Sequence, residues 1–139
     1  MSPSERRPRI LFVCVQNAGR SQMAAGFAHA LGGDRVEVLS AGSSPAGRVH
    51  EVVVVAMKEV GVHLQDAVPK RLTDASVRAS DAVVTMGCGD ACPVFPGQRH
   101  EDWDVEDPSG KPIAKVREIR DDVRRRVVAL LETLGVEPT

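Results

Sequence analysis

The sequence contains no tyrosine and only 3% aromatic residues, so its hydrophobic core must come mainly from Val, Leu, Ile and Ala. Such side chains are typical of a buried parallel sheet covered by helices. No apolar run, the longest being residues 52–57, approaches the roughly 18–20 residues of a membrane-spanning helix. With 18 basic and 19 acidic residues, the formal net charge of −1 argues against a general nucleic-acid-binding protein. We therefore expect neither a membrane nor a nucleic acid as a partner.

The length of 139 residues predicts one domain. Residues 1–8 are polar and charged, and we expect them to form a disordered leader ahead of a single α/β domain over residues 9–137. No apolar segment of signal-peptide length follows, which predicts a cytoplasmic protein. The odd number of cysteines, three, favours reactive thiols over structural disulfides. No long hydrophobic strand edge requires a second copy, so we expect a monomer.

Strand-like and helix-like segments alternate along the chain. Apolar runs predict buried strands at residues 10–13, 36–40 and 81–86 and an edge strand at 100–105. Helical spacing of apolar residues predicts helices at 21–31, 49–60, 72–79 and 116–134. This order predicts a doubly wound α/β fold, with a four-stranded parallel sheet and helices on both faces. Sites in such sheets lie beyond the carboxyl ends of the strands, where Cys14 and residues 40–47 and 87–92 are expected to meet.

The first predicted strand runs into a loop that begins at Cys14 and ends at Arg20, where a helix starts. Loop amides and the free amides of the first helical turn can point at one spot and bind a tetrahedral oxyanion. The predicted oxyanion-binding residues are Val15, Gln16, Asn17, Ala18, Gly19, Arg20 and Ser21. The planar guanidinium of Arg20 can hold two oxygens at once. A helix N-terminus and a cation favour a thiolate, so Cys14 is a candidate nucleophile, with Ser21 as a hydrogen-bond donor to it.

Two further features carry potential chemistry. Asp107, which precedes a proline, is a candidate general acid for a departing oxygen, although Asp-Pro is also a common turn dipeptide. Cys88 and Cys92 lie four residues apart in a segment rich in glycine and proline, and two thiols at this spacing can form a disulfide. The alternatives for this pair are two inert loop thiols or a metal site completed by Asp90 or His100. The lack of a second cysteine pair disfavours the metal site.

Taken together, these motifs resemble the arsenate reductases of the low-molecular-weight tyrosine phosphatase fold. The resemblance covers about residues 8–135. It rests on Cys14-x5-Arg20-Ser21, Asp107-Pro108, the cysteine pair after the third strand, and the strings Ser40-Ala-Gly42 and Asp102-Trp-Asp104. Phosphatases share the Cys-x5-Arg loop, and the added cysteine pair points to the reductases.

The resemblance implies an arsenate reductase without a cofactor. Cys14 would attack arsenic, and Asp107 would protonate the departing hydroxyl. Cys88, by position, would then attack Cys14 and release arsenite. Cys92 would complete a Cys88–Cys92 disulfide for a thioredoxin-like protein to reduce. The cysteine pair is closer here than in the best-known three-cysteine members. This leaves open which thiol attacks first, and whether mycothiol with mycoredoxin or glutathione with glutaredoxin is used instead.

Some members bind potassium beside the loop through carboxylates. This chain has Ala25 and Lys70 at the matching positions, so we expect no metal site and a charge supplied by Lys70. His50 follows the predicted 40–47 loop without an evident partner. Trp103 and Met86 are expected to pack in the core.

The alternative function is a low-molecular-weight protein tyrosine phosphatase. It would use Cys14, Arg20 and Asp107 in the same roles. Such phosphatases carry aromatic residues around the cleft, whereas Ser109 and Gly110 follow the Asp-Pro pair here, so a phosphotyrosine ring would lack a stacking partner. We therefore expect only weak phosphatase activity. A non-catalytic redox switch, the other class considered, would need neither the arginine nor the aspartate.

Overall fold

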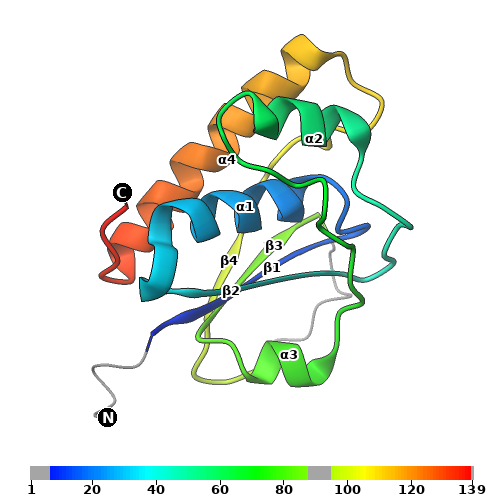
Figure 1. The fold of residues 1–139 in the computed structure, drawn as a ribbon. Coiled ribbons are helices and arrows are strands. Elements are labelled where there is room, and N and C mark those ends of the chain that lie inside the picture. Colours follow the sequence, from blue (N-terminus) through cyan, green and yellow to red (C-terminus); the bar gives the residue numbers. More distant parts are fainter. Residues whose placement is uncertain (1–6, 88–94, 139) are drawn as a thin grey trace.

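The computed structural model describes residues 7–87 and 95–138. Its four strands form one parallel sheet in the order β2-β1-β3-β4 (Figure 1). The strands are β1 (Arg9–Cys14), β2 (Glu37–Gly42), β3 (Ala82–Met86) and β4 (Arg99–Asp102). The two central strands, β1 and β3, are almost wholly buried, as expected of a parallel sheet covered on both faces.

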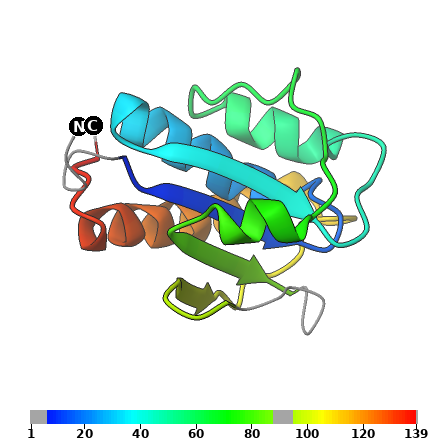
Figure 2. The same cartoon turned by 90° about the horizontal axis from the view of Figure 1, so that it is seen from below.

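Helices cover both faces of the sheet, which confirms the predicted doubly wound architecture. Seen from below, α3 lies on the near face, and the three longer helices lie behind the sheet (Figure 2). The helices are α1 (Arg20–Gly32), the short 3-10 helix η2 (Gly33–Arg35), α2 (Glu51–Lys58), α3 (Asp74–Arg78) and α4 (Ile113–Thr133). Among the described residues, no helix combines the length and apolar character that crossing a bilayer requires.

The largest differences between predicted and observed element boundaries are at the end of β4 and the start of α4. The edge strand expected at 100–105 is β4, which ends at Asp102 because that residue already pairs with Thr85, next to the last residue of β3. The long helix starts at Ile113 instead of residue 116, because Pro112 supplies the extended residue at its N-terminus. A proline fits this place because the first helical turn leaves amides unpaired.

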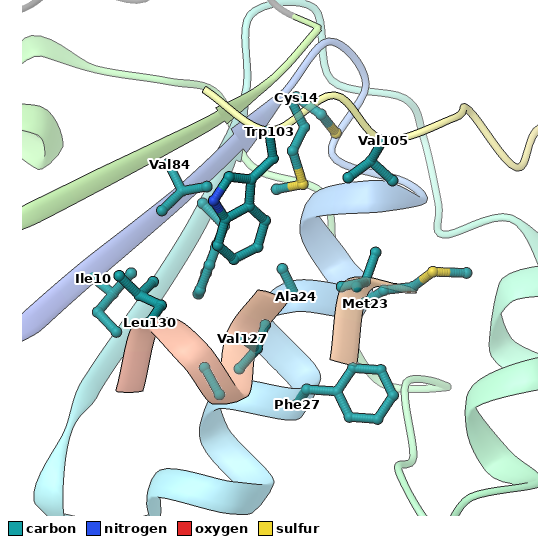
Figure 3. Close-up of a cluster of buried hydrophobic side chains, with 14 of the residues drawn as sticks. Ile10, Cys14, Met23, Ala24, Phe27, Val84, Trp103, Val105, Val127 and Leu130 are labelled. Carbon is teal, nitrogen blue, oxygen red and sulfur yellow. The ribbon is translucent and has the colours of Figure 1, made fainter. Parts of the chain in front are cut away.

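The main core lies between the sheet and the three longer helices. Alternation along β1 points Ile10, Phe12 and Cys14 to this side, while Leu11 and Val13 face the smaller core beneath α3. Trp103 packs beside Phe12, with ring centroids 5.9 Å apart, and both Trp103 and Met86 are buried, as predicted. Figure 3 shows Cys14 at the edge of this cluster, near Trp103 and Val105. The last side chain of β1, that of Cys14, therefore lies at the boundary between the core and the surface.

Of the predicted leader, the structure describes only residues 7 and 8, because residues 1–6 lie outside the described part of the chain. Arg7 and Pro8 both contact the start of β2. The Arg7 guanidinium donates to the Glu37 carboxylate at 2.7 Å, and the Glu37 amide donates to the Pro8 carbonyl at 2.9 Å.

A carboxylate and two guanidinium groups join α2 to α4. Arg117 donates to both oxygens of the Glu59 carboxylate, at 2.9 and 2.8 Å. Arg120, whose side chain is only 10% exposed, donates to the same carboxylate at 2.9 Å and to the Ala56 carbonyl at 2.9 Å. These bonds, led by that from Arg117, lower the pKa of Glu59 from 4.5 to about 2.

This pKa predicts how the stability of the fold depends on pH. A carboxyl whose pKa is lower in the folded chain stabilises it above the unfolded value, and the contribution disappears as pH falls through the folded value. We expect Glu59→Gln to lower the thermal unfolding midpoint at pH 7. The gap to the original chain should narrow as the pH falls from 4.5 toward 2. Circular dichroism melting curves recorded between pH 7 and pH 2 measure the difference between the two unfolding midpoints.

Glu118→Gln is the matched control, because Glu118 lies in α4 between Arg117 and Arg120 and its side chain has no ion pair within the described residues. Its unfolding midpoint should follow that of the original chain at each pH. A gap for Glu59→Gln that stays constant down to pH 2 would contradict the assigned role of the carboxylate.

Candidate active site

A cavity of about 240 Å³ opens at the carboxyl end of β1. Three segments far apart in the sequence meet there: the loop after β1, the start of α2, and the segment ahead of α4. The lining residues are Cys14, Val15, Gln16, Gly19, Arg20, His50, Asp107 and Ser109. The structure thus brings the sequence-derived candidates Cys14, Arg20 and Asp107 into one cavity. Cys88 and Cys92 lie outside the described residues.

The loop after β1 turns its carbonyl groups away from the cavity. Four of these carbonyls accept hydrogen bonds from amides of the segment between β2 and α2. The pairs are Ser43 N to Cys14 O at 3.3 Å, Ser44 N to Val15 O at 2.8 Å, Ala46 N to Gln16 O at 2.9 Å and His50 N to Ala18 O at 2.9 Å. A trans peptide holds its C=O and the following N–H on opposite sides. The next amide in each case therefore points inward, as Asn17 N does, donating to Cys14 Sγ at 3.3 Å.

Asn17 gives the loop its turn and is fully buried beneath it. Its φ of 50° lies in the left-handed region, which asparagine tolerates better than most residues. The side-chain oxygen accepts from Lys70 N at 2.9 Å and from Gln22 Nε2 at 3.2 Å. These two donors orient the amide so that Nδ2 donates to Ser21 Oγ at 2.6 Å. Lys70 thus contacts this network through its backbone amide.

The Asn17 network also sets the direction of the hydroxyl of Ser21. Because Ser21 Oγ already accepts a hydrogen bond from Asn17, its own proton is free for Cys14 Sγ, which lies 2.9 Å away. The sulfur of Cys14, a residue only 2% exposed, therefore receives donors from a hydroxyl and from the Asn17 backbone amide. These two contacts fix the position of the sulfur at the base of the cavity.

Arg20, the first residue of α1, spans the cavity toward the segment ahead of α4. Its Nη1 donates to Val105 O at 3.4 Å, and its Nη2 lies 3.8 Å from Asp107 Oδ2. The arginine side chain is 14% exposed and the aspartate 55%, so this long pair contributes little and leaves the guanidinium available to an anion. Asp107 is oriented by Ser109 N, which donates to Oδ1 at 3.0 Å.

At three glycines around the loop, a Cβ atom would lie within 3 Å of another group. A Cβ atom on Gly42 would lie 2.6 Å from Val15 O, and one on Gly19 would lie 2.9 Å from Pro108 Cγ. Gly87, at φ +82°, would place a Cβ atom 2.6 Å from Arg20 Nη1. The Val15 carbonyl and the Pro108 ring can therefore occupy their places because these side chains are absent. At Gly87 the positive φ is the stronger constraint, because the arginine guanidinium is the mobile end of a long side chain.

His50 is the lining residue to which the sequence assigned no role. It lies between the segment that follows β2 and the start of α2. Its backbone amide donates to Ala18 O in the loop of residues 14–20, here called the oxyanion loop. Its position after the strand next to β1 is the signal that could have identified it, since such segments border sites in parallel sheets. Within residues 7–87 and 95–138, no group of three or more His, Cys, Asp or Glu side chains could hold a metal ion.

Substitution of Gly42 tests whether the inward amides bind an oxyanion. We expect Gly42→Ala to weaken phosphate binding about tenfold or more, because the new Cβ must displace the Val15 carbonyl and turn the adjoining amides. Gly47→Ala is the matched control on the same segment, since a Cβ there meets nothing within 4 Å. Titration calorimetry of the reduced proteins with phosphate measures both. Equal affinity of the two variants would argue against an amide-built site.

Comparisons with known proteins agree with this geometry. A family model described as low molecular weight phosphotyrosine protein phosphatase matches residues 9–138. A putative arsenate reductase of Halobacterium salinarum is 42% identical over 126 residues, 87% of this chain and 89% of that protein. The glutaredoxin arsenate reductase of Synechocystis is 34% identical over 130 residues, 91% and 98% of the two chains.

Among solved structures, a thioredoxin-dependent arsenate reductase of Corynebacterium glutamicum superposes with a TM-score of 0.84 and 43% identity. The match covers 95% of this chain and 64% of that one, so this chain spans about two thirds of its length. The family match extends over nearly the whole sequence and includes every residue that lines the cavity. The chain belongs to the low-molecular-weight phosphotyrosine protein phosphatase family.

Proposed function

We propose that this chain reduces arsenate to arsenite, with Cys14 as the nucleophile and the thiols of the chain as the source of electrons. The observation that carries the proposal is a buried cysteine sulfur beneath inward-pointing amides and a guanidinium, in a cavity sized for a small oxyanion. The relatives at 42% and 34% identity are named arsenate reductases, which supports arsenate as that oxyanion.

In the first step, the loop amides of residues 15–20 and Arg20 hold three oxygens of arsenate. The thiolate of Cys14 attacks arsenic and forms the S–As bond. The opposite As–O bond breaks, and the departing hydroxyl takes a proton from Asp107 and leaves as water. Arsenic stays pentavalent, since no electron has yet been transferred to it.

In the second step, a thiolate attacks Cys14 Sγ and forms a disulfide. The electron pair of the S–As bond passes to arsenic, which leaves as trivalent arsenite. By sequence position we assign this thiolate to Cys88, which directly follows Gly87, the residue that approaches Arg20. Cys92 then displaces Cys14 and leaves a Cys88–Cys92 disulfide. The two electrons lost by the thiols equal the two gained by arsenic.

An external dithiol must reduce the Cys88–Cys92 disulfide before the next turnover. We propose a thioredoxin-like protein acting on a monomer in the cytoplasm, where thiols are kept reduced. The Corynebacterium relative is described as thioredoxin-dependent, and the Synechocystis relative carries the name of a glutaredoxin enzyme. Mycothiol with mycoredoxin, or glutathione with glutaredoxin, is the alternative donor and would attack the Cys14 adduct directly.

Phosphatase activity is the second candidate function, because phosphate has the same shape and charge as arsenate. The family is named for phosphotyrosine phosphatases, and Cys14, Arg20 and Asp107 would act in the same order. The described residues lining the cavity include no Phe, Tyr or Trp. A phosphotyrosine ring would thus find no stacking partner among them, and we propose only weak hydrolysis of aryl phosphates.

A single-turnover experiment tests the proposal. Fully reduced protein with arsenate and no added thiol should release about one arsenite per chain, and mass analysis should find the Cys88–Cys92 disulfide. Cys14→Ser should release none, because no S–As bond can form. Cys92→Ser should stop at a Cys14–Cys88 disulfide if Cys88 attacks first.

Each other outcome has a defined meaning. Release of arsenite only after mycothiol or glutathione is added would overturn the internal relay and keep Cys14 as the nucleophile. Brisk hydrolysis of an aryl phosphate, without arsenite under either condition, would replace the reductase by the phosphatase.

A further inference from the structure

His50 is fixed at the cavity from two directions. Its backbone amide donates to Ala18 O at 2.9 Å, and its carbonyl accepts from Val53 N at 3.0 Å and Val54 N at 3.1 Å as α2 begins. The imidazole packs on the loop, since Cδ2 lies 3.5 Å from where a Cβ of Gly19 would stand. This half-buried side chain is therefore held beside the oxyanion loop by the same contacts that shape it.

The ring nitrogens of His50 are available to a ligand. Neither forms a hydrogen bond or an ion pair with another described residue, although the side chain lines the cavity. An imidazole offers one N–H donor and one acceptor when neutral and two donors when charged. A residue that lines the cavity therefore carries a polar ring whose nitrogens have no partner among the described residues.

The direction of the reaction identifies which substrate atom lies near His50. Cys14 is at the buried base of the cavity, so an oxygen that departs in line with its attack points to the open side. The loop and Arg20 provide the rest of the lining, and the open side is left to His50, Asp107 and Ser109. Asp107 and Ser109 are both exposed, whereas His50 is half-buried and fixed by its backbone.

We propose that His50 donates a hydrogen bond to the departing oxygen and so selects a hydroxyl over an organic leaving group. This inference rests on the proposed function. While the S–As bond forms and the As–O bond breaks, Asp107 supplies the proton and His50 keeps its own. A free oxyanion leaves room for the imidazole beside the hydroxyl, whereas the organic group of a phosphate ester must occupy the same space.

The test compares two substrates in the full-length reduced protein. We expect His50→Ala to lower the single-turnover rate with arsenate about tenfold, with a smaller effect on the apparent affinity, because one hydrogen bond to a developing charge is lost. Hydrolysis of p-nitrophenyl phosphate should rise, because space opens for the aryl group. His50→Asn, which keeps a side-chain N–H, should recover part of the arsenate rate.

Glu51→Gln is the matched control, since Glu51 follows His50 at the start of α2, is exposed and is not among the residues that line the cavity. It should leave both rates within about twofold. Equal losses of both activities in His50→Ala, or no loss of either, would overturn the proposal. If the unsubstituted chain released no arsenite, the proposed reductase function would be wrong, whatever the result for His50→Ala. A rise in aryl phosphate hydrolysis in His50→Ala would still support the leaving-group role, and its absence would oppose it.

Discussion

The hydrogen bonds between the carbonyls of the oxyanion loop and the amides of residues 43–50 are the constraint on which the rest of the site depends. They face outward, and peptide planarity therefore forces the neighbouring amides inward. The contact is possible because β1 and β2 are adjacent and in register up to Cys14 and Gly42. It also requires glycine at position 42, where any side chain would press on the loop backbone. The parallel sheet thus positions an anion site without any charged side chain from β2.

A buried sulfur needs partners that replace water, and the loop supplies them in a fixed order. Asn17 receives donors from Lys70 and Gln22 and passes a hydrogen bond to Ser21, which leaves the hydroxyl proton of Ser21 for Cys14. Arg20 adds positive charge to the wall of the cavity, where its guanidinium donates to Val105 O and lies close to Gly87. The polar groups behind the cysteine are therefore satisfied before any substrate binds. Such preorganisation is what nucleophilic attack on an anion requires, because no reorientation is left for the moment of reaction.

Much of this arrangement could be predicted from local patterns. Apolar runs and helical spacing indicated the four-stranded parallel sheet, and the rule that sites lie beyond carboxyl ends placed Cys14 and residues 40–47 at one edge. The Cys14-x5-Arg20 loop and the Asp107-Pro108 pair added the other two candidates. The residue type of Asn17 predicts a left-handed turn that braces the loop, and its φ of 50° agrees with this. The long-range hydrogen bonds of Asn17 and His50 could not be foreseen in the same way. Asn17 acts through a contact with Lys70, 53 residues away, and His50 through a bond to Ala18. Neither contact leaves a periodic or spaced signature, because each depends on how the β2 segment lies against the loop. The end of β4 at Asp102 likewise depends on where its pairing with β3 stops.

We propose that the inward amides of a preformed loop bind the substrate oxyanion directly above Cys14. A crystal structure of the reduced protein with phosphate would show whether they do. We expect phosphate oxygens within hydrogen-bond distance of the amides of Val15, Gln16 and Gly19 and of the Arg20 guanidinium. The phosphorus should lie over Cys14 Sγ, and the four outward carbonyl bonds should be unchanged. Phosphate bound elsewhere, or a loop that breaks those carbonyl bonds to accept it, would show that the loop is not a preformed oxyanion site.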